Sequence, residues 1–251
     1  MDKVVATPEM IHERLYHIGK AAIAILEKHD IPYSIAYGTL LGAVRHGGFI
    51  PWDDDFDIWL FDDSYDEAIE CLRAELPGDM FLEDEKSEPK YFHGWAHIKD
   101  LRSITSRNKY IQDDAYQHKG LHIDLYRCTK LPESEVWKFI DEENRKYIER
   151  RMRVGLFTEE EYKVRLERLA QDEADHASFN GDPEKTVFLL LDMKMYIDED
   201  CVFPLKKYKF EDSEFYGFGN ADKALTAIYG DYMTPLPEDQ REMIHSEVFF
   251  I

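Results

Sequence analysis

Four aspartates stand within five positions at the start of a predicted strand: Asp53, Asp54, Asp55 and Asp57. In an extended chain alternate side chains share a face, so Asp55 and Asp57 should point the same way. Asp53 can join them, whereas Asp54 should point to the other side. Two or three carboxylates on one face are the hard oxygen ligands that Mg²⁺ or Mn²⁺ prefers. The spacing therefore predicts a divalent-metal site at Asp55 and Asp57.

Other interpretations of this acidic cluster are a solvated turn, a set of turn or N-capping hydrogen bonds, and a calcium loop. A solvated turn does not explain why the apolar residues Phe56 and Ile58 flank the last aspartate. A calcium loop of EF-hand type fails, because its glycine position holds Ile58 and its final glutamate position holds Ser64. Hydrogen bonding alone stays open, and composition by itself does not decide for catalysis.

The residues upstream and downstream favour phosphate chemistry. Gly38 and Thr39 follow a predicted strand and precede a short helix, where backbone N–H groups can cradle a phosphate. Arg45 lies within reach of an anion. Asp124 is the one acidic residue of the largely apolar segment 121–125, and a buried aspartate there needs a partner or a metal. A small-residue turn, a pair of aspartates and a third carboxylate are what two-metal phosphoryl transfer requires.

Hydrophobic periodicity predicts the elements that position these residues. A helix should begin at Thr7-Pro8 and bury one face, and a capping box from Ser64 to Glu67 should open another that runs to Leu76. Strands are expected at 33–37, 55–61, 80–83, 94–99 and 121–126, and further helices at 40–45, 133–153, 158–178 and 221–229. Their order predicts an α+β protein with a mixed sheet flanked by helices.

The charged helices between about 133 and 178 are expected to form a solvated helical insertion in one domain spanning 1–251. With 251 residues, 44% of them hydrophobic, the chain can bury one sizeable core. Its formal net charge of −21 and the absence of a Lys/Arg-rich run argue against nucleic acid as a partner. The same charge implies that anionic substrates need a divalent cation between them and the protein.

The sequence also bears on the compartment. Cys71, Cys128 and Cys201 are scattered, which indicates reduced thiols. We find neither a secretory signal nor an apolar stretch of the roughly 20 residues that cross a bilayer. We therefore expect a cytoplasmic protein without a transmembrane segment. Peripheral association with the inner face of the membrane stays open.

Several segments resemble the LicD family, which includes bacterial phosphocholine transferases and, more distantly, fukutin-type ribitol-phosphate transferases. Residues 37–58 are similar to its signature and read YGTLLGAVRHGGFIPWDDDFDI. Residues 119–125, KGLHIDL, resemble its second acidic strand, and 203–211, 229–233 and His245 resemble its C-terminal region. One departure is Tyr126-Arg127, where the family often has an aromatic residue followed by proline. That departure concerns the edge of the acceptor pocket.

The resemblance implies a nucleotidyltransferase-like fold and a metal-dependent phosphotransferase. Carried over residue by residue, Gly38 and Thr39 match the phosphate-cradling turn, Asp55 and Asp57 the paired metal ligands, and Asp124 the third acid. The expected reaction moves phosphocholine from CDP-choline, or another CDP-alcohol, to a glycan or glycolipid hydroxyl, such as that of a teichoic acid or a capsular or lipopolysaccharide repeat. CMP is released. The expected cofactor is Mg²⁺ or Mn²⁺.

Within this reaction Asp124 would orient or deprotonate the acceptor hydroxyl, and Arg45 or Lys99 would neutralise the leaving CMP. Choline needs an aromatic cage, for which Trp52, Tyr37, Tyr91 and Trp95 are candidates, although core packing accounts more readily for any single one of them. His93, His97 and His122 are candidates for supporting the site or binding the acceptor, although a structural role accounts more readily for each. Three alternatives are kept: CDP-ribitol or CDP-glycerol as donor, an NTP-dependent nucleotidyltransferase acting on a small molecule or protein, and a non-catalytic domain that binds a metal or sugar.

Overall fold

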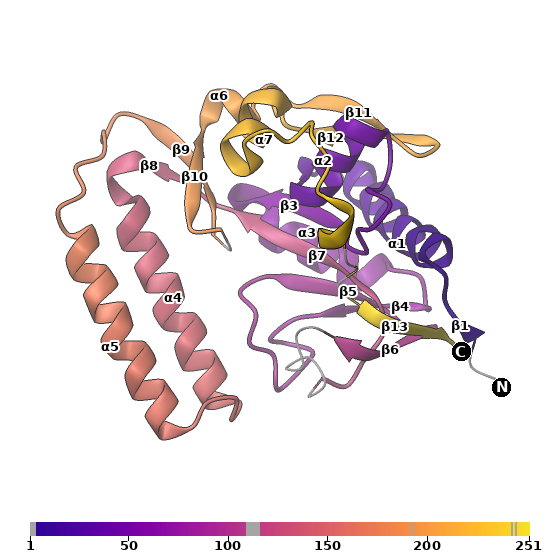
Figure 1. Ribbon diagram of the computed structural model, residues 1–251, viewed down its shortest axis with the longest axis horizontal. Helices are drawn as coiled ribbons and strands as arrows, with labels where there is room; N and C mark the ends of the chain where they lie inside the picture. Colours follow the sequence, from indigo (N-terminus) through magenta and orange to yellow (C-terminus); the bar gives the residue numbers. More distant parts are fainter. Residues whose placement is uncertain (1–3, 109–115, 192, 242, 244) are drawn as a thin grey trace.

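The computed structural model describes residues 4–108, 116–191, 193–241, 243 and 245–251. A five-stranded sheet runs through its centre in the order β2-β3-β7-β5-β4 (Figure 1). Its strands are β2 (Tyr33–Ile35), β3 (Asp57–Phe61), β7 (His122–Cys128), β5 (Ala96–Asp100) and β4 (Met80–Glu83). Strands β3 and β7 are parallel and the other neighbours are antiparallel, so the predicted mixed sheet is confirmed.

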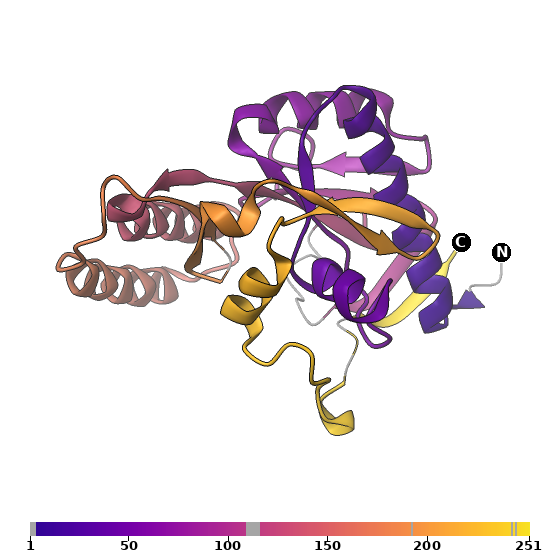
Figure 2. The same cartoon turned by 90° about the horizontal axis from the view of Figure 1, so that it is seen from above.

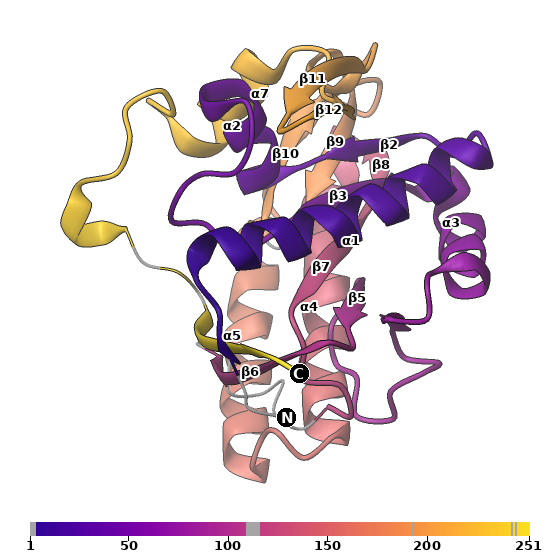
Figure 3. The ribbon, with the colours of Figure 1, turned by 90° about the vertical axis from the view of Figure 1, so that its right-hand side faces the viewer.

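Helices cover both faces of this sheet. Helices α1 (Pro8–Lys28) and α3 (Asp62–Glu75) pack on one face, and α2 (Tyr37–His46) and α7 (Ala221–Tyr229) lie on the other (Figures 1 and 2). Figure 3 shows α1 crossing the sheet. The Thr7 side chain caps α1 by accepting a hydrogen bond from the Met10 N–H group, as predicted. The buried stripe of α1 follows the predicted spacing: Ile11, Leu15, Ile18, Ala22, Ile25 and Leu26.

The predicted capping box at Ser64 is wrong. Helix α3 begins two residues earlier, at Asp62, and no side chain caps it. The Ser64 hydroxyl instead donates to the Phe61 carbonyl at 3.3 Å. Asp62 and Asp63 occupy the first turn, where negative charge is favourable beside the positive end of the helix dipole. The predicted strands differ from the observed ones at their ends by two residues or fewer.

Smaller sheets and short helices surround the central sheet. The three-stranded sheets contain β1 (Val4–Val5), β13 (His245–Phe250) and β6 (Ser103–Asn108), and β10 (Met195–Asp198), β9 (Thr186–Leu190) and β8 (Lys130–Pro132). A hairpin is formed by β11 (Lys206–Phe210) and β12 (Ser213–Gly217), and the short helices are η2 (Glu133–Glu135), α6 (Glu199–Val202) and η3 (Glu238–Gln240). The sequence analysis did not predict these elements, except that η2 lies within the helix expected at 133–153.

Helices α4 (Val136–Arg153) and α5 (Glu159–His176) form a pair that projects from the body of the molecule (Figure 1). The capping box that opens α5 joins Thr158 and Glu161. Leu169 is the buried residue of α5, which agrees with a largely solvated helix. The two predicted charged helices are therefore present. That they are an insertion in a single domain stays a prediction.

Candidate active site

Three carboxylates converge at the start of strands β3 and β7. Asp57 and Asp124 are paired in register on these parallel strands, and the Asp124 N–H group donates to the Phe56 carbonyl at 3.1 Å. Asp55 lies just before β3. Ligand oxygens of Asp55, Asp57 and Asp124 all lie within 4.8 Å of one another. The structure therefore brings together the three residues that the sequence analysis selected.

Packing of Phe56 on α1 explains why Asp55 and Asp57 point to the opposite face of the sheet, where Asp124 lies. The fully buried ring of Phe56 presses against Gly19 of α1, where an added Cβ would come within 2.6 Å of Phe56 Cε1. Because side chains alternate along extended backbone, Asp55 and Asp57 on either side of Phe56 face away from α1. The Thr39 hydroxyl accepts a hydrogen bond from the Asp57 N–H group at 2.8 Å. One apolar residue and one hydroxyl thus orient the pair.

Gly38 and Thr39 lie in the first turn of α2, which begins at Tyr37. A Cβ on Gly38 would come within 2.5 Å of Asp53 Oδ2, so only glycine leaves room for the Asp53 carboxylate. The Thr39 side chain is buried. Their observed contacts therefore go to Asp53 and Asp57. No side chain caps the start of α2, and a phosphate-cradling role for this turn stays a prediction.

The electrostatics of the site favour a bound cation. Burial raises the pKa of Asp55 well above its usual range, and the nearby carboxylates of Asp124 and Asp53 raise it further. Burial, followed by the charge of Asp54, raises the pKa of Asp53 to about 7. Buried carboxylates this close repel one another unless positive charge lies between them. The three oxygen donors fit a hard divalent cation such as Mg²⁺ or Mn²⁺.

Asp124 is held by two side chains of the Trp95–Asp100 segment. Trp95 Nε1 donates to Asp124 Oδ1 at 2.8 Å, and His97 Nε2 lies 3.0 Å from the same oxygen. Burial disfavours the charged carboxylate, but the charge of His97 and its hydrogen bond outweigh burial, so the pKa of Asp124 lies below its usual value. His97 Nδ1 lies 3.5 Å from Glu83 Oε2, which completes a buried chain of three residues. The contacts with Trp95 and His97 thus fix the orientation of the Asp124 carboxylate.

The sequence analysis named His97 as a candidate but did not connect it with Asp124, Trp95 or Glu83. Trp95 was named only as a candidate for a choline cage, and Glu83 was not named. The strand register brings these residues together, because His97 pairs with Asp124 across β5 and β7 and with Glu83 across β4 and β5. His97 and Asp124 also form a second group of potential metal ligands together with His122. Strand alternation alone does not reveal which strands are neighbours.

The predicted phosphate-binding residues lie in different surroundings. Lys99 is buried, with its Nζ atom 3.2 Å from His122 Nδ1 and 3.7 Å from Glu83 Oε2. Arg45 is in the last turn of α2, and its Nη1 atom donates to the Tyr232 carbonyl at 2.6 Å. The Trp52 ring lies near the same end of α2, 6.2 Å from the His46 ring. Lys99 thus contacts His122 and the buried Glu83, whereas Arg45 and Trp52 are half exposed.

Aromatic rings border Asp124, but in a different set from the one predicted. The Trp95 and Tyr126 ring centroids lie 4.8 Å apart, and those of Tyr126 and Tyr37 lie 5.2 Å apart. Tyr91 is buried in another cluster with Phe92 and Tyr116. Of the predicted cage residues, Trp95 and Tyr37 are therefore joined through Tyr126.

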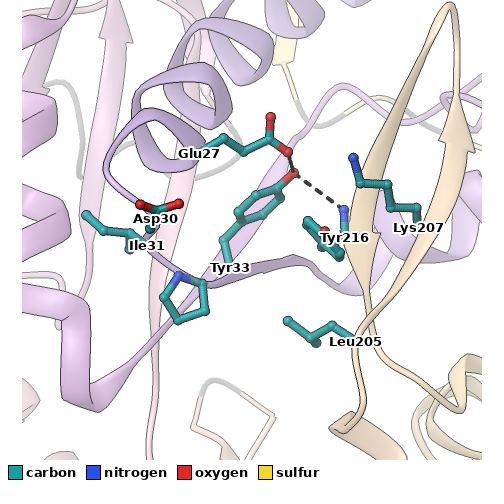
Figure 4. A pocket seen from close by; sticks show the side chains of 8 residues that line it. Glu27, Asp30, Ile31, Tyr33, Leu205, Lys207 and Tyr216 are labelled. Carbon is teal, nitrogen blue, oxygen red and sulfur yellow. Dashed lines mark hydrogen bonds between the residues drawn. The ribbon is translucent and has the colours of Figure 1, made fainter.

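A surface cavity of about 400 Å³ lies elsewhere (Figure 4). Glu27, Tyr33, Lys207 and Tyr216 are among its lining residues, and the Tyr33 hydroxyl donates to Glu27. Tyr33 pairs with Leu60, at the opposite end of β3 from Asp57. This cavity is therefore separate from the carboxylates.

Among the described helices, none has the length and apolar composition of a membrane-spanning segment.

Comparison with known proteins agrees with this geometry. Residues 30–154 match the LicD/FKTN/FKRP nucleotidyltransferase domain. Lipopolysaccharide cholinephosphotransferase LicD of Haemophilus influenzae is 25% identical over 256 residues, which cover 91% of this chain and 92% of that protein. An uncharacterised protein of Rickettsia prowazekii is 51% identical over 136 residues, 47% of each chain. Human ribitol 5-phosphate transferase FKRP is 36% identical over 120 residues, 48% of this chain and 21% of FKRP.

Proposed function

The chain belongs to the LicD family, whose domain its residues 30–154 match, and we propose that it transfers phosphocholine from CDP-choline to a hydroxyl group of a bacterial cell-surface glycan. The observation that carries this proposal is the convergence of Asp55, Asp57 and Asp124 within 4.8 Å. Similarity along 91% of the chain to a cholinephosphotransferase supports the choice of phosphocholine. The free thiols of Cys71, Cys128 and Cys201 agree with a cytoplasmic reaction.

Asp55, Asp57 and Asp124 would hold Mg²⁺ or Mn²⁺, which when bound offsets the negative charge of the donor pyrophosphate. Trp95 and His97 engage Asp124 Oδ1 at 2.8 and 3.0 Å, whereas the contact of Oδ2 with the Tyr126 hydroxyl is longer, at 3.5 Å, so we assign Oδ2 to the acceptor hydroxyl. Asp124 orients this hydroxyl and takes its proton. The hydroxyl oxygen forms a bond to the phosphorus that carries choline, and the bond from that phosphorus to the bridging oxygen breaks. CMP leaves with the electron pair of the broken bond.

The rings beside Asp124 favour choline over a polyol. A quaternary ammonium group cannot form hydrogen bonds and is bound by the faces of aromatic rings. Trp95 and Tyr126 provide such rings, and both also hydrogen bond to Asp124, at 2.8 and 3.5 Å. Ribitol phosphate is the second candidate for the transferred group, because this chain is 36% identical over 120 residues to FKRP, a ribitol 5-phosphate transferase.

A donor comparison tests this function. The purified protein is incubated with a glycan acceptor, with Mg²⁺ or a chelator, and with CDP-choline, CDP-ribitol, CDP-glycerol, ATP or CTP in turn. We expect CMP and a choline-bearing glycan from CDP-choline, and no product with the chelator. Turnover of CDP-ribitol alone would replace choline by ribitol. Release of pyrophosphate from ATP or CTP would favour a nucleotidyltransferase, and no turnover with any donor would leave a non-catalytic domain as the better account.

A further inference from the structure

Two histidines and a lysine lie beside Asp124 on neighbouring strands of the central sheet (Figure 1). His122 and Asp124 are two residues apart on β7, and His97 and Lys99 are two residues apart on β5. The register pairs His97 with Asp124 and Lys99 with His122. Because alternate side chains of a strand share a face, all four side chains project from the same side of the sheet. The fold therefore places imidazole nitrogens next to a carboxylate of the site.

The distances in this group suit a metal ion. His97, His122 and Asp124 each offer one ligand atom, and these atoms lie within 4.8 Å of one another. His97 Nε2 is 3.0 Å from Asp124 Oδ1, close to the roughly 3.3 Å between neighbouring ligand atoms around a tetrahedral Zn²⁺. The half-buried His122 ring lies 4.6 Å from the His97 ring, centroid to centroid. A shift of at most about 1.5 Å in the third ligand atom therefore closes the set.

Glu83 supports His97 from the other side. Its Oε2 atom lies 3.5 Å from His97 Nδ1, and both side chains are buried. A histidine that binds a metal usually donates its other N–H group to a carboxylate, which leaves the second nitrogen free for the metal. Glu83 Oε1 is buried and has no hydrogen-bond partner among the described residues. Glu83 thus retains negative charge that a nearby cation would offset.

The ligand atoms of this group differ from those of Asp55 and Asp57. Oxygen atoms alone suit Mg²⁺, whereas imidazole nitrogens favour Zn²⁺ and other transition metals. Two histidines and one carboxylate, with a fourth position open, form the ligand set of several zinc sites. The protein therefore offers an oxygen site and a nitrogen-rich site that share Asp124.

We propose that His97, His122 and Asp124 form a second cation site, selective for Zn²⁺ over Mg²⁺, whose occupation inhibits the enzyme. Zn²⁺ displaces the proton that His97 otherwise shares with Asp124, since imidazole binds a metal in its neutral form. It also draws electron density from the Asp124 carboxylate, which then accepts the proton of the acceptor hydroxyl less readily. The site does not depend on the reaction, whereas the inhibition rests on the proposed function.

Lys99 is the charge that opposes a cation here. Its Nζ atom lies 3.2 Å from His122 Nδ1 and 3.7 Å from Glu83 Oε2. Because Lys99 is buried, solvent and salt screen its charge poorly. Lys99→Met should therefore strengthen Zn²⁺ binding about tenfold or more. If these residues had only a structural role, the same change would produce no gain in Zn²⁺ affinity.

The binding test is isothermal titration calorimetry of ZnCl₂ into the metal-free full chain, with MgCl₂ in excess. We expect His122→Ala to weaken Zn²⁺ binding about tenfold or more, because a ligand is lost. The Asp55→Asn/Asp57→Asn double variant should bind Zn²⁺ as the parent does, because the loss of two negative charges is matched by the loss of bound Mg²⁺. His118→Ala, which changes a half-buried histidine stacked on Phe81, is the matched control. Thermal melting identifies any variant that fails to fold, and His122→Gln then replaces His122→Ala.

The effect on turnover is measured as CMP release with Zn²⁺ relative to the zinc-free rate of the same variant. Zn²⁺ should lower this ratio in the parent and leave it near one in His122→Ala. A ratio that does not fall in the parent, or that falls equally in both proteins, overturns the inhibition.

The site and the proposed function can fail separately. Unchanged Zn²⁺ affinity in folded His122 variants overturns the site, and so does loss of Zn²⁺ binding in the Asp55→Asn/Asp57→Asn variant. Zn²⁺ binding that depends on His122, in a protein that transfers no phosphocholine, supports the site while the proposed function fails.

Discussion

Asp57 and Asp124 face each other in register across two parallel strands, although 67 positions, 124 minus 57, separate them in the sequence. Each is buried, and the Asp124 backbone is tied to the residue that precedes Asp57. The pairing of β3 with β7 therefore determines how far apart the two carboxylates lie. Changes at either residue should affect the chemistry more than the fold.

We expect Asp57→Asn and Asp124→Asn each to lower transfer from CDP-choline about a hundredfold or more, because a metal ligand or proton acceptor is lost. In the metal-free protein Asp57→Asn also removes one repelling charge, so its melting temperature should not fall. Asp124→Asn removes the charge that His97 stabilises, so its melting temperature should fall. CMP release and thermal unfolding are the two measurements. Asp63→Asn, an exposed change in the same region, is the control. Retained activity in Asp57→Asn would remove this residue from the metal site.

Divalent cation should stabilise the protein through the same carboxylates. At about a hundred times its Kd, Mg²⁺ should raise the melting temperature by about 5–10 °C relative to a chelator, because it binds only the folded state. This rise should disappear in an Asp55→Asn/Asp57→Asn double variant. An equal rise in the double variant would show that the cation binds elsewhere.

His97 should act as a positioning residue for Asp124. His97→Leu removes the group 3.0 Å from Asp124 Oδ1, so we expect kcat to fall about tenfold or more while KM for the donor changes little. His97→Gln keeps an N–H donor and should recover most of kcat. Steady-state kinetics of both variants provide the check. Equal losses in kcat accompanied by equal losses of melting temperature would indicate a packing role only.

Gly19 should be intolerant of a methyl group. In Gly19→Ala the new Cβ would come within 2.6 Å of the Phe56 ring, and overpacking of this kind costs about 1–3 kcal/mol. That cost should exceed the gain of about 1 kcal/mol from alanine in a helix. Urea unfolding should show a lower midpoint. Gly78→Ala, where the Cβ meets nothing within 4 Å, is the control. Adding Phe56→Leu to Gly19→Ala should partly restore the urea midpoint, because the smaller side chain leaves room for the methyl group.

Acid should weaken the attachment of α1 to the sheet edge. Burial disfavours the charged form of Asp79, but its hydrogen bond and ion pair with Arg14, at 3.0 Å, outweigh burial and lower its pKa. A lowered pKa contributes stability that is present above the unfolded value of about 3.9 and is lost as the pH falls through the folded value. The difference in urea midpoint between the parent and Asp79→Asn should therefore shrink from pH 6 to pH 2. A constant difference would contradict the ion pair.

Sequence patterns were sufficient for the carboxylates and insufficient for what surrounds them. Asp55 and Asp57 could be predicted because alternation along a strand is a local property. Asp124 could be selected because an acid is unusual in an apolar strand. The contacts of Asp124 with Trp95 and His97 depend on the register of β5 against β7, which no local pattern encodes.

Gly38 and Arg241 show that contacts between residues far apart in the sequence could not be predicted. The role of Gly38 in a phosphate-cradling turn stays a prediction, whereas the close approach of Asp53, which also requires a residue without a side chain, could not be predicted from the sequence. Arg241 could not be connected with Trp52, because residues 230–241 have no periodic pattern and approach α2 only through tertiary contacts. The nucleotidyltransferase-like sheet followed from motifs, whereas the small sheets did not, since their strands are short.

The pair of helices α4 and α5 has a core of its own, around Ile148, Phe157 and Leu169, apart from the main core. Such a unit can open and close with a free energy smaller than that of global unfolding. The end of α4 is joined to the body through Arg150, which donates to the Phe92 carbonyl at 3.1 Å, three residues before Trp95. Transient opening of this pair would therefore loosen the wall beside Asp124 while β3 and β7 stay folded. Such an opening would thus change the surroundings of Asp124 without changing the pairing of β3 with β7.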